Sequence, residues 1–121
     1  MEENIKINKL CFDFEGIDKS QISELVNNFN SIDGFKAYLR HENDLIEVKE
    51  IWVIFFLEFT KDISIGILSS LITYFIIKFF EKEKSNDEKP ITININNIQI
   101  NQGESLQEIE NKMYIIIKNI K

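Results

Sequence analysis

The chain has few of the residues that build catalytic and ligand-binding motifs. Its 121 residues include one cysteine, Cys11, one histidine, His41, one proline and four glycines. A single cysteine cannot form an intrachain disulfide, and a lone histidine without a cysteine cluster is not a transition-metal site. Four glycines are too few for a phosphate-binding loop, and no serine stands in a Gly-x-Ser-x-Gly context. We therefore expect no catalytic residues, no metal and no cofactor, and the chain is not predicted to be an enzyme.

Net positive charge is also missing. The formal charge is -6, so a basic surface for binding nucleic acid is not expected. Hydrophobic residues make up 44% of the chain and charged residues 28%, which is typical of a folded domain and not of a disordered chain. The first residues, 1–4, are acidic and are not a signal peptide, which predicts a cytoplasmic protein. The length fits a single domain, 1–121.

The first third of the sequence predicts a strand, a helix and a second strand. Residues 4–14 alternate as a strand, with a phase change near Asn8 that indicates a bulge or a late start. Residues 18–32 carry apolar residues at helical spacing, and Asp18 or Ser20 can cap this helix. After the turn signal Asp33-Gly34, residues 35–40 alternate as a half-buried strand.

A long apolar run, residues 51–80, dominates the middle of the chain. Asp44 and Glu47 form a capping-box pattern, and the apolar spacing that follows favours a helix over 45–59. A doubly buried strand over 51–57 is the alternative, because β-branched and aromatic residues are frequent there. A second helix is predicted from residue 62 or 63 to residue 82. The segment 45–82 is therefore interpreted as an apolar helical pair inserted between strands.

The last third of the sequence predicts a hairpin and a helix. Residues 91–100 alternate with a phase shift at Asn96-Asn97, where asparagine favours a two-residue turn. A single bulged strand is the alternative. Ser105 and Glu108 form a second capping box before the final helix. The sequence thus predicts an α+β fold, with a small sheet that has amphipathic helices on one face and the helical pair on the other.

The second apolar segment, residues 63–80, has two interpretations. It can be the buried centre of the domain, or it can enter the inner membrane, since about 27 Å of helix nearly spans a bilayer core. Small and polar residues at three- and four-residue spacing allow another helix to approach closely, in a membrane or in a core. These candidate self-association residues are Gly66, Ser69, Ser70 and Thr73.

Aromatic residues supply the candidate partner-binding site. Aromatic anchors dominate protein interfaces, although the same residues can instead fill the core. The candidates are Trp52, Phe55, Phe56 and Phe59. Cys11 is expected to be a buried structural thiol, and the pair Asp13 and Glu15, which would share one strand face, is expected to be a solvated surface pair.

The elements follow one another in a definite order: an opening strand that closes on Asp13-Phe14-Glu15-Gly16, a helix, the strand 35–39, two apolar segments of which the second is rich in small residues over 66–73, a short polar linker, the hairpin 91–100 and a helix from Ser105. This order resembles the effector-associated constant component family of bacterial conflict systems. The resemblance implies an adaptor in antiviral defence whose partner is a co-encoded effector such as a protease. The alternative hypothesis is a small membrane-inserting effector that forms a homo-oligomer and disrupts the inner membrane.

Overall fold

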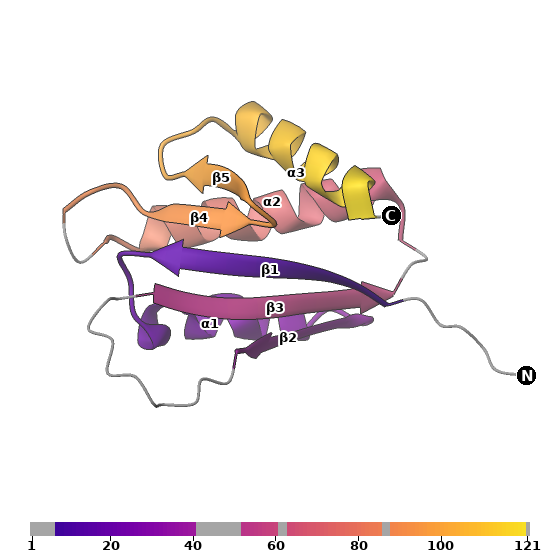
Figure 1. The fold of residues 1–121 in the computed structure, drawn as a ribbon, viewed down its shortest axis with the longest axis horizontal. Helices are drawn as coiled ribbons and strands as arrows, with labels where there is room; N and C mark the ends of the chain where they lie inside the picture. The colour runs from indigo at the N-terminus through magenta and orange to yellow at the C-terminus, as the bar shows by residue number, and fades with distance from the viewer. Residues whose placement is uncertain (1–6, 41–51, 61–62, 86–87, 121) are drawn as a thin grey trace, which may run out of the picture.

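The described part of the chain forms a five-stranded antiparallel sheet with three helices (Figure 1). This computed structural model describes residues 7–40, 52–60, 63–85 and 88–120. The elements are β1 (Ile7–Glu15), α1 (Lys19–Asn30), β2 (Phe35–Leu39), β3 (Trp52–Thr60), α2 (Ile65–Lys82), β4 (Thr92–Ile95), β5 (Ile98–Asn101) and α3 (Leu106–Ile120). The strand order is β2-β3-β1-β4-β5. The small α+β fold predicted from the sequence is confirmed.

The prediction of a helix over 45–59 is wrong for residues 52–59, the part of this segment that the structure describes. Trp52–Thr60 is strand β3, paired with β1 on one side and β2 on the other. Val53, Phe55 and Leu57 are buried in alternation, whereas Ile54 and Phe56 are half-buried. The alternative, a strand, was right, but only one of its faces is fully buried. The expected capping box at Asp44 and Glu47 lies outside the described residues.

Of the two alternatives expected near Asn8, a bulge or a late start, the bulge is absent from the described strand, and residues 4–6 lie outside the described residues. β1 and β3 pair in unbroken register, from Ile7 opposite Thr60 to Glu15 opposite Trp52. The core-facing residues of β1 are Leu10, Phe12 and Phe14, each fully buried. The central strand is therefore regular along the whole of its described length.

Three capping side chains begin the helices. The Asp18 carboxylate accepts from the Gln21 backbone N–H at 3.3 Å, and Gln21 Oε1 accepts in return from the Asp18 N–H at 3.0 Å. Ser105 and Glu108 make the expected second capping box, at 3.1 and 2.8 Å. Ser64 Oγ accepts from the Ile67 N–H and starts α2. Each pair satisfies backbone donors that a helix leaves unpaired at its first turn.

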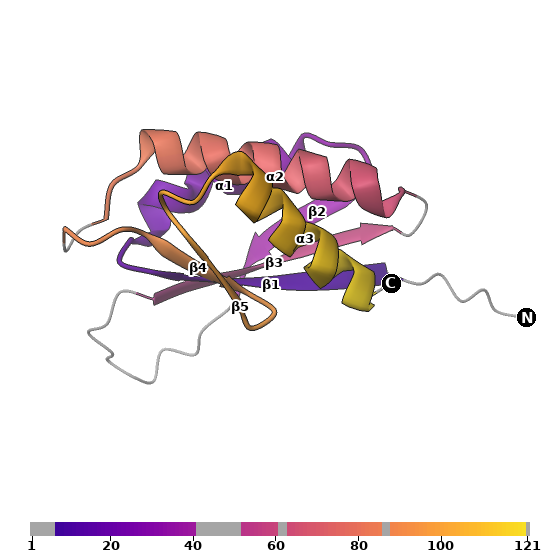
Figure 2. The ribbon, with the colours of Figure 1, turned by 90° about the horizontal axis from the view of Figure 1, so that it is seen from above.

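The helices all lie on one side of the sheet (Figure 2). Phe12 stacks on Phe55 with ring centroids 4.6 Å apart, and Phe29 of α1 makes an edge contact with Phe75 of α2 at 5.2 Å. The third helix, α3, packs against α2 and β5. The expected placement of helices on both faces is therefore wrong: of the predicted helical pair, the described part of the first segment is strand β3, and the second, α2, lies on the same side of the sheet as α1.

The β4–β5 connection is the predicted tight hairpin. Asn96 and Asn97 have φ values of 48° and 74°, the pair of positive values that a type I′ turn requires. Asn96 also continues the pairing of β4 with β1. Its Oδ1 accepts from the Cys11 N–H at 2.9 Å, and its N–H donates to the Cys11 carbonyl at 3.2 Å.

The outer edge of β2 is closed by a side chain. Asn30, the last residue of α1, donates from Nδ2 to the Ala37 carbonyl at 2.9 Å and accepts at Oδ1 from the Ala37 N–H at 2.7 Å. The side-chain amide thus occupies the two positions that a neighbouring strand would take. An open edge strand is a template for unwanted pairing, and this contact blocks it at its centre.

Candidate functional site

One face of the sheet carries no described helix (Figures 1 and 2). We call it the open face. Its central residues come from three adjacent strands: Tyr38 of β2 lies opposite Phe56 of β3, which lies opposite Cys11 of β1. Ile54 lies opposite Asp13 in the next row. The described residues that alternation places on this face are Lys9, Cys11, Asp13, Glu15, Lys36, Tyr38, Ile54, Phe56, Glu58, Thr92, Asn94, Gln99 and Asn101.

Two aromatic rings form the centre of the open face. The centroids of Tyr38 and Phe56 are 5.6 Å apart, and both side chains are half-buried. Lys9 Nζ lies 4.6 Å from the Phe56 centroid, and Lys36 Nζ lies 5.6 Å from the Tyr38 centroid. These are cation–π distances, so the lysine stems cover part of the apolar surface while their charged ends reach solvent.

Tyr38 is fixed by a hydrogen bond along the sheet. Its hydroxyl donates to Glu58 Oε2 at 2.6 Å, and this bond, which is lost when the phenol ionises, raises the pKa of Tyr38. Glu58 lies between Lys36 and Lys9 in the register, which places opposite charges directly across from one another. The ring is therefore held in one orientation by its neighbours on the same face.

The other half of the open face is acidic. Asp13 and Glu15 share this face of β1, as predicted. Partial burial and then the charge of Glu15 raise the pKa of Asp13, against the opposing effect of Arg40. Burial and Asp13 raise the pKa of the Cys11 thiol. Cys11 is half-buried on this face, not in the core as expected, because Leu10 and Phe12 take the core-facing positions.

The structure separates the predicted partner-binding residues. Phe55 and Phe59 are 0% and 1% exposed and belong to the core, so they contact no partner in the folded state. Phe56 lies on the open face. Trp52 is the first residue of β3, but its side chain lies outside the described residues, as does His41. Sequence reasoning missed Tyr38 and Ile54 as site residues. The alternation of residues 35–40 already placed Tyr38 on the face of its strand that points away from the core.

The small residues of α2 divide in the same way. Ser69 and Thr73 are each 1% exposed, and Ser69 Oγ donates to the Ile65 carbonyl at 2.8 Å. Gly66 and Ser70 are exposed, and Ser70 Oγ donates to Glu110 Oε2 of α3 at 2.8 Å. Two of the four residues, Ser69 and Thr73, are therefore buried within the described fold. Among the described residues, none of the helices is long and apolar enough to cross a membrane.

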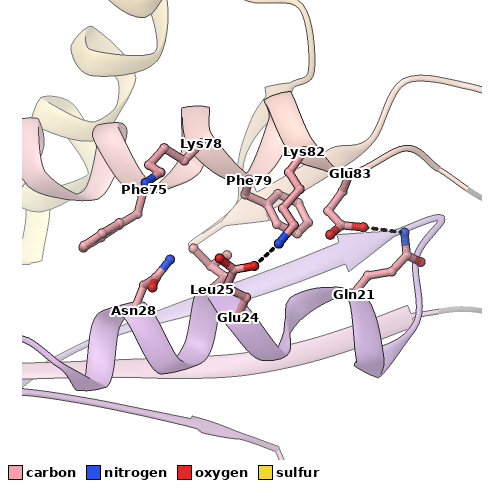
Figure 3. Close-up of a pocket in the computed structure, with 9 residues that line it drawn as sticks. All are labelled: Gln21, Glu24, Leu25, Asn28, Phe75, Lys78, Phe79, Lys82 and Glu83. Atoms are coloured by element: carbon pink, nitrogen blue, oxygen red, sulfur yellow. Dashed lines mark hydrogen bonds and ion pairs between the residues drawn. The ribbon is translucent and has the colours of Figure 1, made fainter.

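A small cavity lies between α1 and α2 (Figure 3). Its volume of about 40 Å³ is far below the ~300–1,000 Å³ of sites for small organic ligands. At its rim Lys82 pairs with Glu24, and Gln21 Nε2 donates to Glu83 Oε1 at 3.2 Å. The hydrogen bond from Lys82 lowers the pKa of Glu24, and the same bond raises that of Lys82. These contacts join the two helices and leave room for little more than water.

Within the described ranges, no group of three or more His, Cys, Asp and Glu side chains is placed to hold a metal ion. Comparison of the chain with family models, with curated proteins and with solved structures gave no match in any of the three.

Proposed function

We propose that the chain is a non-enzymatic adaptor that binds a protein partner through the open face of its sheet. The observation that carries this proposal is the pair of ordered aromatic rings, Tyr38 and Phe56, at the centre of a sheet face without a described helix. Tyrosine and other large aromatic residues are enriched among the residues that dominate binding energy, and they act best at the centre of an interface.

The surroundings of the two rings fit the usual plan of a protein interface. Ile54 extends the apolar centre, and the charged residues Lys9, Lys36 and Glu58 form a polar margin. An apolar centre with a polar margin is typical of interfaces between proteins that also exist apart. The acidic half, with Asp13 and Glu15, favours a partner that presents basic residues to that side.

The resemblance to effector-associated constant components supplies the biological setting. Under that proposal the chain acts in bacterial defence, and its partner is an effector encoded beside it, such as a protease. The partner-binding residues are then Phe56 and Tyr38, with Ile54 beside them. Phe55 and Phe59 contribute indirectly, because they hold β3 in place from the core side.

The test uses the proteins encoded by the neighbouring genes. Each is purified and titrated with the wild-type chain and with the Tyr38→Ala/Phe56→Ala double variant by isothermal titration calorimetry. We expect one neighbour to bind, and the double variant to bind at least ~10-fold more weakly, since loss of central aromatic anchors costs more than ~1 kcal/mol each. Tyr114→Ala is the matched control, because Tyr114 is 45% exposed on α3, away from the open face.

Two results would overturn the proposal. If none of the neighbouring proteins binds the wild-type chain, the adaptor function is wrong. If a neighbour binds the wild-type chain and the double variant equally well, the proposal that binding occurs through the open face is wrong, and weaker binding of Tyr114→Ala would place the site on the helical side. Circular dichroism of each variant checks that the fold is retained.

A further inference from the structure

The outer side of α2 carries large apolar side chains that are exposed to solvent. Ile67 is 61% exposed and Tyr74 is 53% exposed, and Leu71 lies between them at helical spacing. The same stripe continues to Lys78 and Glu81. α2 lies on the helical side of the sheet, so this stripe is on the opposite side of the molecule from the open face (Figure 2).

A shallow depression lies beside the apolar stripe. It is lined by Ser64, Gly66, Ile67, Ser70, Leu71, Tyr74 and Glu110. A Cβ built on Gly66 would meet nothing within 4 Å, so intrachain packing of the described residues does not require glycine at this position. Glycine is less favourable than alanine in a helix. Its presence leaves the backbone of α2 open to close approach by another chain.

The charges around this stripe complement one another. Glu110 of α3 lies at one rim, where its Oε2 accepts from Ser70. Lys78 lies further along α2, between this stripe and the cavity beside α1, and its Nζ is 5.3 Å from the Tyr74 ring centroid. Along the helix axis this surface thus carries Glu110 first, then Lys78 and, near the end of α2, Glu81. When a second copy is turned by 180°, its Lys78 comes toward Glu110 and its Glu110 toward Lys78, so these two groups complement each other between copies.

We propose that the outer face of α2 is the interface of a homodimer in which the two α2 helices pack antiparallel about a two-fold axis. In such an isologous contact the same patch serves both copies. A register that places Leu71 against Tyr74 of the second copy also places Ile67 against the stem of its Lys78. Two apolar contacts are then repeated by symmetry on each side of the axis.

The same register also brings opposite charges of the two copies together. Side chains on a helix point toward its N-terminus, as the position of Lys78 over Tyr74 shows. In the antiparallel pair, the Lys78 ammonium of one copy therefore reaches the Ser70 and Glu110 rim of the other. Glu81 lies opposite Ser64, at the N-terminus of the second α2, where the helix dipole favours negative charge. A contact of one helix with one helix is at the small end of specific interfaces, so the dimer is reversible.

Charge exchange between copies tests this interface. Sedimentation velocity of the full chain over a range of concentrations measures the dimer dissociation constant. We expect Lys78→Glu alone and Glu110→Lys alone to raise that constant at least ~10-fold. An equimolar mixture of the two single variants restores dimerisation, because each copy then offers the charge that the other needs. Lys118→Glu, an exposed change on α3 with the same charge difference as Lys78→Glu, is the control and leaves the constant within about 2-fold of wild type.

The proposal is overturned if the wild-type chain sediments as a monomer at every concentration at which it is soluble. It is also overturned if the chain dimerises but the two single variants dimerise as the control does. If the Tyr38→Ala/Phe56→Ala variant abolishes dimerisation instead, the open face is the interface between copies and the assignment to α2 is wrong. Unchanged thermal melting of the single variants excludes loss of the fold as the cause.

Discussion

Removing the Asn30 side chain should show how far the sheet depends on its closed edge. In Asn30→Ala the Ala37 N–H and carbonyl lose their contacts at 2.7 and 2.9 Å. A net ~0.5–1.5 kcal/mol for each hydrogen bond gives a loss of about 1–3 kcal/mol. Alanine is a better helix former than asparagine by about 0.5 kcal/mol, which offsets part of that loss. Water reaches the exposed edge, so we expect a net loss of about 1–2 kcal/mol.

Urea denaturation followed by circular dichroism measures this change as a lower midpoint with an unchanged slope. Asn27→Ala is the matched control, because Asn27 is exposed on the same helix, and we expect its stability within about 0.5 kcal/mol of wild type. Asn30→Asp keeps the acceptor for the Ala37 N–H but loses the donor to its carbonyl, so its stability should be below that of wild type.

The same variant has a second expected effect. An unpaired N–H and carbonyl at the centre of an edge strand can pair with another chain. We therefore expect Asn30→Ala to scatter more light than wild type after incubation at the same concentration and temperature, while Asn27→Ala does not. If Asn30→Ala matches its control in both urea midpoint and scattering, the edge-closing role of Asn30 is refuted.

Three further predictions concern single side chains. The folded-state pKa of Asp13 is raised, so the folded chain holds that proton more tightly than the unfolded chain, and stability falls as pH rises from the unfolded value of ~3.9 through the raised value. Asp13→Asn should therefore raise the melting temperature more at pH 7 than at pH 4, and an equal change at both would contradict this. Asn96→Ala should lower the free energy of unfolding, measured by urea denaturation, by about 1–3 kcal/mol, because alanine disfavours φ of 48° and cannot accept from the Cys11 N–H. The control Asn119→Ala should leave that free energy unchanged. Cys11 should react with iodoacetamide at pH 7.5 more slowly than free cysteine, since its thiol pKa is raised, and a faster reaction would count against the half-buried position.

The features that the sequence predicted correctly are those decided by neighbouring residues. Asp18, one of the two cap candidates of the first helix, and Ser105 with Glu108 act over one helical turn, and Asn96-Asn97 sets the hairpin by its own backbone preference. Such local signals need no knowledge of the rest of the fold.

The features that it missed depend on distant parts of the chain. Residues 52–59 are almost all apolar, so they satisfy helical and strand periods at once. Pairing with β1 and β2 decides for the strand. That choice also determines the candidate site, because a helix would put Phe55, Phe56 and Phe59 on one stripe, whereas a strand sends Phe56 to the face opposite the other two.

The position of β1 in the middle of the sheet has a consequence for synthesis. Phe12 pairs with Phe55 on one side and with Ile95 on the other, so the strand made first is completed by elements made much later. At ~5–20 residues per second, the β4–β5 hairpin leaves the ribosome several seconds after β1. Pairing between such distant segments is also slow once the chain is complete. During that interval Leu10, Phe12 and Phe14 are uncovered on a strand with an open edge, and we expect the nascent chain to need chaperone protection that the finished domain does not.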